Sequence, residues 1–170
     1  MEKLDLVDKN DNIVGVTTKD EAHEFGYIHR VAAVFVFTPD GKLYIQEHIK
    51  TGNRYDHSVG GHVLRGESYD DAAKREAAEE LGITDPLTKV TTFLSDDGRG
   101  HMFGLYEVIP SKSWKFVPND EVKNIISMTL PEVVEMMNKE PDKFTHGFRW
   151  TMKKYLEVKK LPYLLNKNIF

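Results

Sequence analysis

The chain carries several short apolar runs that are typical of strands. Residues 29–38 are almost continuously apolar, which predicts a strand buried on both faces. Residues 42–48 alternate in character, and the Pro-Asp-Gly turn at residues 39–41 predicts that the two segments pair as a hairpin. Further strands are expected at residues 4–8, 12–17, 88–95, 101–109 and 122–128, and residues 49–55 are expected to form a polar loop.

Four other segments have the apolar spacing or the capping residues of helices. Thr18 is a suitable N-cap with Glu21 as its capping-box partner, and Gly26 ends that helix. Ser68 caps a second helix, which Gly82 ends. The helices are expected at residues 18–25, 68–82, 131–140 and 147–159.

The order of these elements predicts the fold class. Strands and helices are interspersed without a regular alternation, which favours a mixed sheet with helices on its faces, an α/β (α+β) architecture. The 170 residues are enough for one domain with a hydrophobic core, and no internal repeat or linker divides them. A single domain over residues 1–170 is therefore expected.

Composition narrows the classes of partner. The net charge is −4 and no broad basic surface is indicated, which disfavours generic nucleic-acid binding and binding to anionic membranes. The absence of cysteine excludes disulfides, thiolate metal sites and a cysteine nucleophile. No apolar run approaches membrane-spanning length, and the first residues lack the apolar core of a secretory signal. A cytoplasmic location is expected.

The helix at residues 68–82 places acidic side chains where apolar ones belong. On a helical wheel, Glu76 and Glu80 fall within the apolar arc, and Glu79 lies beside it. Burying like charges without a partner is costly, and a hard divalent cation such as Mg²⁺ would offset that cost through oxygen ligands. Arg75 stands one turn before Glu79 and is expected to pair with it.

Residues with a fixed spacing extend beyond this helix. From Gly61 to Gly82 the chain reads G-x5-E-x7-R-E-x2-E-E-x-G, a spacing that arises by chance at about 10⁻⁸ of starting positions. Gly60 and Gly61 allow unusual backbone shapes and a close approach of the main chain. A solvated, salt-bridged helix is the alternative interpretation, but it explains neither the glycine pair nor Glu67.

This spacing resembles the signature of the Nudix hydrolase family, without a departure at its fixed positions. The resemblance implies an α/β/α sandwich with a mixed sheet and a catalytic loop-helix-loop. It also implies a divalent metal, Mg²⁺ with Mn²⁺ as a substitute, held against a diphosphate by Glu76, Glu79, Glu80 and the carbonyl of Gly60. The resemblance covers most of the chain, and its specificity is concentrated in residues 60–83.

A second resemblance is to the subgroup related to isopentenyl diphosphate isomerase. It runs from Asp5 through His29-Arg30 to residues 58–62, and it implies a histidine metal site with His23, His29 and His62 as candidates. Ordinary hydrogen-bonded structural histidines are the alternative. Gly60 stands where the isomerase has its catalytic cysteine, and residues 99–105 lack the isomerase's acidic pair. Both departures disfavour isomerase chemistry, which needs an acid and a base.

The expected reaction is therefore metal-dependent hydrolysis of a phosphoanhydride bond. Glu79 is the expected general base, with Glu121 of a later loop and His101 as alternatives. Glu80 joins it among the catalytic residues, Arg75 is expected to orient the ligands, and Glu67 is expected to support the loop or an outer metal.

The expected substrate is a nucleoside di- or triphosphate, or another X-linked diphosphate. Arg54, Tyr55 and His62 are candidate substrate contacts, and several aromatic residues could stack on a base. The chain tail, residues 161–170, could dock on the protein or pack in a homodimer. Two other functions stay open, namely an isopentenyl diphosphate isomerase-like enzyme and a non-enzymatic ligand-sensing module. The aromatic candidates are Phe25, Tyr27, Tyr55, Phe103 and Trp114.

Overall fold

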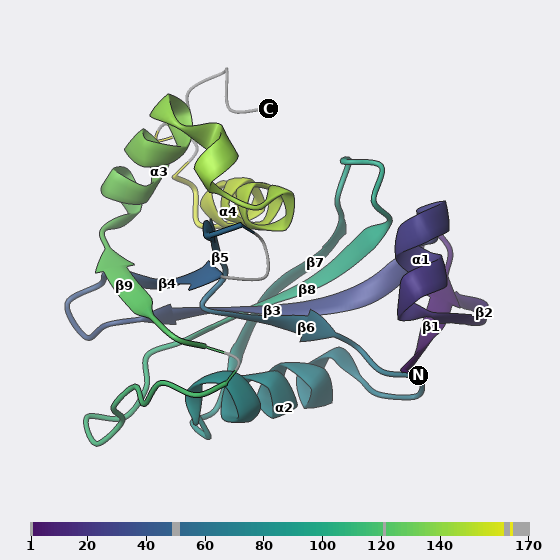
Figure 1. Ribbon diagram of the computed structural model, residues 1–170, viewed down its shortest axis with the longest axis horizontal. Coiled ribbons are helices and arrows are strands. Elements are labelled where there is room, and N and C mark those ends of the chain that lie inside the picture. The colour runs from purple at the N-terminus through teal and green to yellow at the C-terminus, as the bar shows by residue number, and fades with distance from the viewer. Residues whose placement is uncertain (1, 49–51, 121, 162–163, 165–170) are drawn as a thin grey trace.

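The protein is a mixed β-sheet covered by helices on both faces (Figure 1). The computed structural model describes residues 2–48, 52–120, 122–161 and 164. The strands in these residues are β1 (Lys3–Val7), β2 (Ile13–Thr18), β3 (His29–Phe37), β4 (Leu43–His48), β5 (Arg54–Asp56), β6 (Val59–His62), β7 (Thr88–Leu94), β8 (His101–Val108) and β9 (Ile125–Met128). The helices are α1 (Lys19–Phe25), α2 (Tyr69–Leu81), α3 (Leu130–Lys139) and α4 (His146–Val158), with the short 3-10 helix η2 (Pro141–Lys143).

The predicted α/β/α class is confirmed, and the differences from prediction lie in the loops. Residues 54–56, expected in a polar loop, form strand β5 along the edge of β4. Strand β9 begins at Ile125 rather than at Val122, although Val122 is buried. Most of the tail and residues 49–51 lie outside the described residues. No described helix has the length and apolar character needed to cross a membrane.

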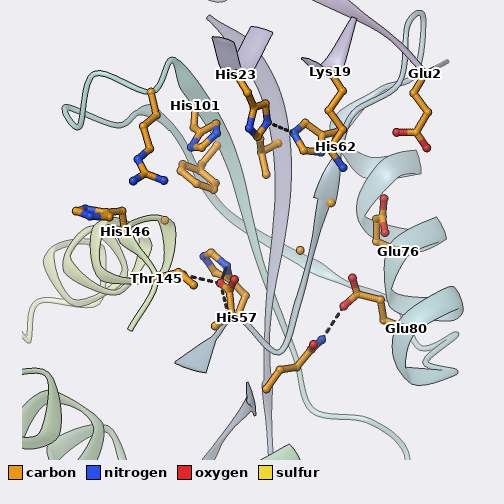
Figure 2. Close-up of a pocket in the computed structure, with 18 of the residues that line it drawn as sticks. Glu2, Lys19, His23, His57, His62, Glu76, Glu80, His101, Thr145 and His146 are labelled. Carbon is orange, nitrogen blue, oxygen red and sulfur yellow. Dashed lines mark hydrogen bonds and ion pairs between the residues drawn. The ribbon is translucent and has the colours of Figure 1, made fainter. Parts of the chain in front are cut away.

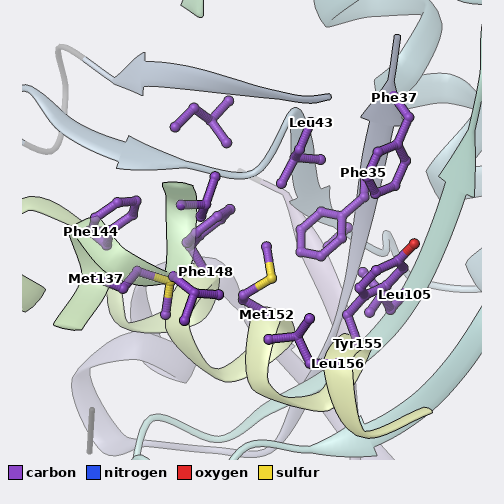
Figure 3. Packing of buried hydrophobic residues seen from close by; sticks show 14 of the residues in the cluster. Phe35, Phe37, Leu43, Leu105, Met137, Phe144, Phe148, Met152, Tyr155 and Leu156 are labelled. Carbon is purple, nitrogen blue, oxygen red and sulfur yellow. The ribbon is translucent and has the colours of Figure 1, made fainter. Parts of the chain in front are cut away.

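Strand β3 is the centre of the sheet. It pairs in antiparallel fashion with β1, β4 and β6, and in parallel with β8. Side chains alternate along a strand, so β3 supplies a hydrophobic core on each face. Ala33, Phe35 and Phe37 pack with α3 and α4, as Figure 3 shows for the two phenylalanines, whereas the residues between them pack with α2.

The pairing of β3 also brings distant polar residues together. In the parallel register with β8, His29 lies opposite His101. In the antiparallel register with β6, Ala32 and Ala33 lie opposite Gly61 and Gly60. The beginning of β3 and β8 therefore carries histidines, while β6 passes between β3 and the helix α2.

Local sequence fixes the helices that border this region. Thr18 Oγ accepts the backbone N–H of Glu21, and the Glu21 carboxylate accepts the backbone N–H of Thr18, which makes the predicted capping box of α1. Ser68 Oγ accepts the backbone N–H of Asp71 at the start of α2. Gly82 ends α2 with φ 64°, a conformation that glycine adopts at little cost.

Candidate functional site

One cavity of about 580 Å³ collects the residues singled out by the sequence (Figure 2). Helix α2 and strand β6 form one wall, and α1 and the beginning of β8 form the second. The third wall consists of β5 and the beginning of α4. Elements separated by more than a hundred residues of sequence therefore meet around one space.

The glutamates of α2 occupy the first wall as the helical wheel predicts. Glu80 is 9% exposed, and the side chain of Glu76 is 13% exposed. The side chain of Glu79 is 51% exposed, which leaves it accessible to solvent at the cavity edge. Gln46 on β4 donates from Nε2 to Glu80 Oε2 at 2.7 Å and to the carbonyl of Ser58 at 2.7 Å. The most buried carboxylate is thus held by an amide.

Gly61 is required because the Glu76 carboxylate lies against its backbone. A Cβ atom at position 61 would overlap with both carboxylate oxygens of Glu76. The expectation of an unusual backbone shape at Gly60 and Gly61 is wrong, since both lie in strand β6 and neither has a positive φ. The left-handed position in this loop is Gly66, with φ 78°.

Arg75 connects the loop to the acidic wall. Its Nε and Nη2 donate to the two oxygens of Glu67 at 2.9 Å each, a bidentate pair. Its Nη1 donates to Glu76 Oε1 at 2.6 Å and to Glu79 Oε2 at 3.3 Å. The predicted contact with Glu79 exists, but Glu67 and Glu76 are the closer partners. Arg75 also donates to the carbonyl of His62 at 3.1 Å.

Four histidines cluster at the second wall, where His62 at the end of β6 and the buried His29 of β3 join His23 and His101. His23 Nε2 lies 2.9 Å from His62 Nε2, and the ring centroids of His29 and His62 are 5.3 Å apart. Ring nitrogens of His23, His29 and His101 all lie within 4.8 Å of one another. His101 is the partly buried first residue of strand β8, where the predicted strand at residues 101–109 begins.

The burial of these imidazoles determines their protonation. Burial, and after it the neighbouring His29, lower the pKa of His62 to about 2 and that of His101 to about 4. Burial also lowers the pKa of His23 and of His29. All four rings are therefore neutral at pH 7 and carry an unshared electron pair, the form that binds metals.

His29 shows which nitrogen is available. Its Nδ1 lies 2.8 Å from the carbonyl of Tyr27, and because a carbonyl only accepts, Nδ1 carries the proton. The unprotonated Nε2 is buried and has no hydrogen-bond partner among the described residues. His101 Nδ1 is likewise buried without a partner there. An unpaired nitrogen in a buried histidine cluster fits a metal ligand better than a structural hydrogen bond.

The structure of the third wall shows that one predicted substrate contact, Tyr55, is wrong. In strand β5, Arg54 and Asp56 line the cavity. Tyr55 lies between them, so its side chain points to the opposite face of the strand and packs against Phe144 at 5.4 Å between ring centroids. Of the five aromatic candidates, Phe103 lines the cavity. Trp114 instead donates from Nε1 to the carbonyl of Leu81.

The third wall contains a hydrogen-bond network that the sequence did not predict. His57 is 6% exposed, and its Nδ1 lies 2.7 Å from Asp56 Oδ1. Thr145 Oγ donates to the same oxygen at 2.9 Å, which joins β5 to the start of α4. Ser58 and Val59 separate Asp56 and His57 from the glycine pair, and Gln46 follows the buried Ile45 in strand β4. The sequence shows that Asp56, His57 and Gln46 are polar, but it does not show which residues they bond to.

The donor sets fit two kinds of divalent cation. On the first wall, Glu76, Glu79 and Glu80 line the cavity, and Arg75 pairs with Glu76, Glu79 and the adjacent Glu67. This excess of carboxylates over cations suits a hard cation such as Mg²⁺. The histidine wall offers nitrogen donors, which suit Mn²⁺ or Zn²⁺. The alternative base Glu121 lies outside the described residues.

Comparison with known families agrees with this geometry. Residues 27–148 match the NUDIX domain family. The chain belongs to the Nudix family. The match includes strand β3, the glycine pair, α2 and the first residues of α4, so it contains most of the cavity wall.

Relatives of this Nudix protein have different names. It is 42% identical over 117 residues to an uncharacterized Nudix hydrolase of Streptomyces coelicolor, in an alignment that covers 63% of this chain and 64% of the relative. It is 32% identical to isopentenyl-diphosphate Delta-isomerase 2 of Photorhabdus laumondii, over 87% of this chain and 89% of that protein. A prenyl-diphosphate phosphatase of Methanosarcina mazei is 28% identical, over 84% and 88% of the two chains.

A solved structure shares the fold over nearly the whole length. The crystal structure of DR0079 from Deinococcus radiodurans is similar with a TM-score of 0.72 and 25% sequence identity. The alignment covers 94% of this chain and 99% of that chain. The likeness therefore extends beyond the residues of the family match.

Proposed function

We propose that this Nudix protein is a metal-dependent hydrolase that cleaves a phosphoanhydride bond in a nucleoside di- or triphosphate or another X-linked diphosphate. The observation that carries the proposal is the acidic wall, where the partly buried Glu76 lies against Gly61 and beside Arg75, and the buried Glu80 is held by Gln46. The names of the Streptomyces and Methanosarcina relatives support hydrolysis.

The residues of the first wall have distinct proposed roles. Glu76, Glu79, Glu80 and the carbonyl of Gly60 would hold Mg²⁺ or Mn²⁺, which when bound offsets phosphate charge and lowers the pKa of water. Glu79 is the most exposed of the three carboxylates, so it is the one placed to accept the proton of an attacking water. Arg75 and Glu67 position Glu76 and Glu79 through the contacts described above.

The histidine wall is the proposed second metal site. His23, His29 and His101 would supply nitrogen ligands, with His62 adjacent to them. The hydrogen bond from His29 to the Tyr27 carbonyl orients that ring and leaves its second nitrogen aimed at the other histidines.

Isomerisation of a prenyl diphosphate is the second candidate. The 32% identity to the Photorhabdus isomerase over 87% of this chain favours it. Against it, Gly60 replaces the isomerase's cysteine, and β8 from His101 to Leu105 carries no carboxylate. An alkene isomerase needs groups that add and remove protons on carbon, and these positions do not supply them.

The test is a panel of nucleotides and other diphosphates with Mg²⁺ or Mn²⁺, assayed for phosphate and pyrophosphate. Glu79→Gln and Glu80→Gln should each lower kcat on the best substrate by about 10²–10³-fold with native circular dichroism. Glu135→Gln is the matched control, because Glu135 is an exposed glutamate of helix α3 that pairs with Lys139 and lies outside the cavity lining.

Two results would decide against the proposal. Near-native rates in both variants of the acidic wall would remove the proposed roles of Glu79 and Glu80. Conversion of isopentenyl diphosphate without phosphate release would instead establish the isomerase.

A further inference from the structure

Most of the described residues that line the cavity are polar or charged. Among its described lining residues, the larger apolar side chains are Val31, Leu64 and Phe103. The remainder are charged or hydrogen-bonding groups and glycines. An extended hydrocarbon chain would leave these polar groups without water or a partner, which costs free energy for each group. The lining therefore fits a substrate that is hydrophilic beyond its diphosphate.

Two arginines lie across the cavity from the glutamates, on a wall that also holds Asp56 paired with His57. Arg54, Arg99 and His146 line this wall, and Figure 2 shows His146 on the side of the cavity away from Glu76 and Glu80. Partial burial and then the charges of neighbouring arginines lower the pKa of His146, so its ring is neutral at pH 7. Guanidinium groups bind phosphate and carboxylate oxygens through charge-assisted hydrogen bonds, so a bound anion suits this wall.

Hydrogen bonds orient His146 as a donor. Arg149 Nη2 lies 2.9 Å from His146 Nδ1, and because a guanidinium only donates, Nδ1 is the accepting nitrogen. The proton of the neutral ring is then on Nε2, where it is available to an acceptor. Arg149 itself has a buried Nε with no hydrogen-bond partner among the described residues.

The loop before β8 holds Arg99 in place. Asp97 Oδ1 accepts the backbone N–H of Arg99 at 3.1 Å and the hydroxyl of Ser95 at 2.8 Å. Gly100 has φ 72°, and a Cβ atom there would overlap with the carbonyl of Tyr27. The loop is thus packed against the segment that precedes β3, so the position of Arg99 follows from a built turn.

We propose that the group attached to the diphosphate is hydrophilic and carries a second anion, a phosphate or a carboxylate, which Arg54, Arg99 and His146 bind opposite the glutamates. This inference rests on the proposed hydrolysis of a diphosphate at the acidic wall. It assigns the rest of the substrate to a chemical class and separates that class from prenyl diphosphates.

The experiment compares matched substrates that differ by one anion. ADP is compared with its 3′-phosphorylated derivative, and UDP-glucose with UDP-glucuronate; dimethylallyl diphosphate is the apolar reference. We expect kcat/KM to be about tenfold higher for the anionic member of one pair, because a charge-assisted contact forms there. A higher value for the 3′-phosphorylated derivative of ADP would indicate that the site binds a phosphate. A higher value for UDP-glucuronate would indicate that it binds a carboxylate.

Arginine variants test which residues cause the preference for the anionic substrate. Arg54→Ala and Arg99→Ala should each reduce the preference about tenfold. Arg65→Ala is the control, since Arg65 is an exposed arginine outside the cavity lining. Its substrate preference should match that of the unmodified protein.

Calorimetric binding of the same compounds to Glu79→Gln separates this inference from the proposed function. Preferential binding of the anionic members without any hydrolysis by the unmodified protein would sustain the second-anion site and end the hydrolase proposal. Hydrolysis of ADP with no preference in either pair would support the hydrolase proposal and exclude the second-anion site. A preference that survives both arginine variants, or fastest turnover of dimethylallyl diphosphate, would also overturn the inference.

Discussion

At the scale of single residues, the site depends on groups that tolerate little change. Arg75 engages Nε, Nη1 and Nη2 at the same time, with Glu67, Glu76 and the carbonyl of His62 among its acceptors. A lysine has one nitrogen on a flexible stem and cannot reproduce this planar fork. The loop, the strand β6 and the helix α2 are therefore joined by one guanidinium.

Gly61→Ala should damage the site without unfolding the protein. Its methyl group would displace the Glu76 carboxylate, which is held by Arg75 at 2.6 Å. A displacement near 1 Å is enough to lower kcat about 10²-fold. Gly15→Ala on β2 is the control, because the nearest side-chain atom would lie 3.4 Å from the added methyl, an ordinary contact. Equal rates in both variants would contradict this role of Gly61.

The histidine wall should make stability depend on pH. Because the pKa of folded His101 is about 4, lowered from 6.5, the unfolded chain binds a proton that the folded state excludes as pH falls between these values. Stability therefore decreases as pH falls from 6.5 towards 4. Between pH 7 and pH 5 this one group removes about 2 kcal/mol.

Urea denaturation at pH 7 and pH 5, in the presence of a chelator, measures this effect. His101→Gln should lose less stability than the unmodified protein over the same interval, by about 2 kcal/mol. If His101→Gln and the unmodified protein lost the same stability between pH 7 and pH 5, the proposed contribution of His101 would be wrong.

At the scale of elements, α1 is the weakest support of the cavity. It has seven residues and carries Lys19 and His23 into the lining. A helix of this length is unstable alone, so its capping box and its contacts with the sheet must hold it. The strand β3 is the opposite case, because cores on both faces fix it.

Thr18→Ala should weaken metal binding at the histidine wall from a distance. Loss of an N-cap costs about 1 kcal/mol. Thr129→Ala removes the same capping box from α3, where Glu132 is the partner and no residue lines the cavity. Both variants should lose similar stability in urea, but only Thr18→Ala should lower Mn²⁺ or Zn²⁺ affinity, by roughly fivefold, in calorimetry. Equal metal affinities in the two variants would show that α1 does not support the histidine site.

The elements were largely predictable because their determinants are local. Thr18 with Glu21, and Ser68 with Gly82, define helix ends within a few residues of sequence. The glutamates of α2 could be placed because the helical period relates them to each other. Tyr55 was misplaced because a strand of three residues shows no readable alternation, and its orientation depends on pairing with β4.

Contacts between distant segments were beyond the sequence. Gln46 and Glu80 are 34 residues apart and meet only once the sheet and α2 pack. His101 reaches His29 through the parallel register of β8 with β3, which no local pattern specifies. Arg54, Arg99 and His146 line the cavity from three separate segments, and their meeting could not be predicted for the same reason.

At the scale of the whole molecule, the two walls should respond to different cations. Cation binding to the folded state at a hundred times Kd stabilises it by about 2.7 kcal/mol, which thermal unfolding detects. Glu80→Gln should lose the response to Mg²⁺ and keep the response to Zn²⁺. His23→Asn should show the reverse, and because His23 is exposed, its replacement leaves the core intact. Loss of both responses in either variant would mean a single shared site.

The third wall has a consequence for the order in which the protein acquires activity during synthesis. The glycine pair and α2 leave the ribosome well before Thr145, His146 and Gly147, which complete the cavity. A nascent chain that already contains every signature glutamate therefore lacks an enclosed space in which to hold a phosphate ester. The cavity is therefore complete only when α4 docks on the sheet.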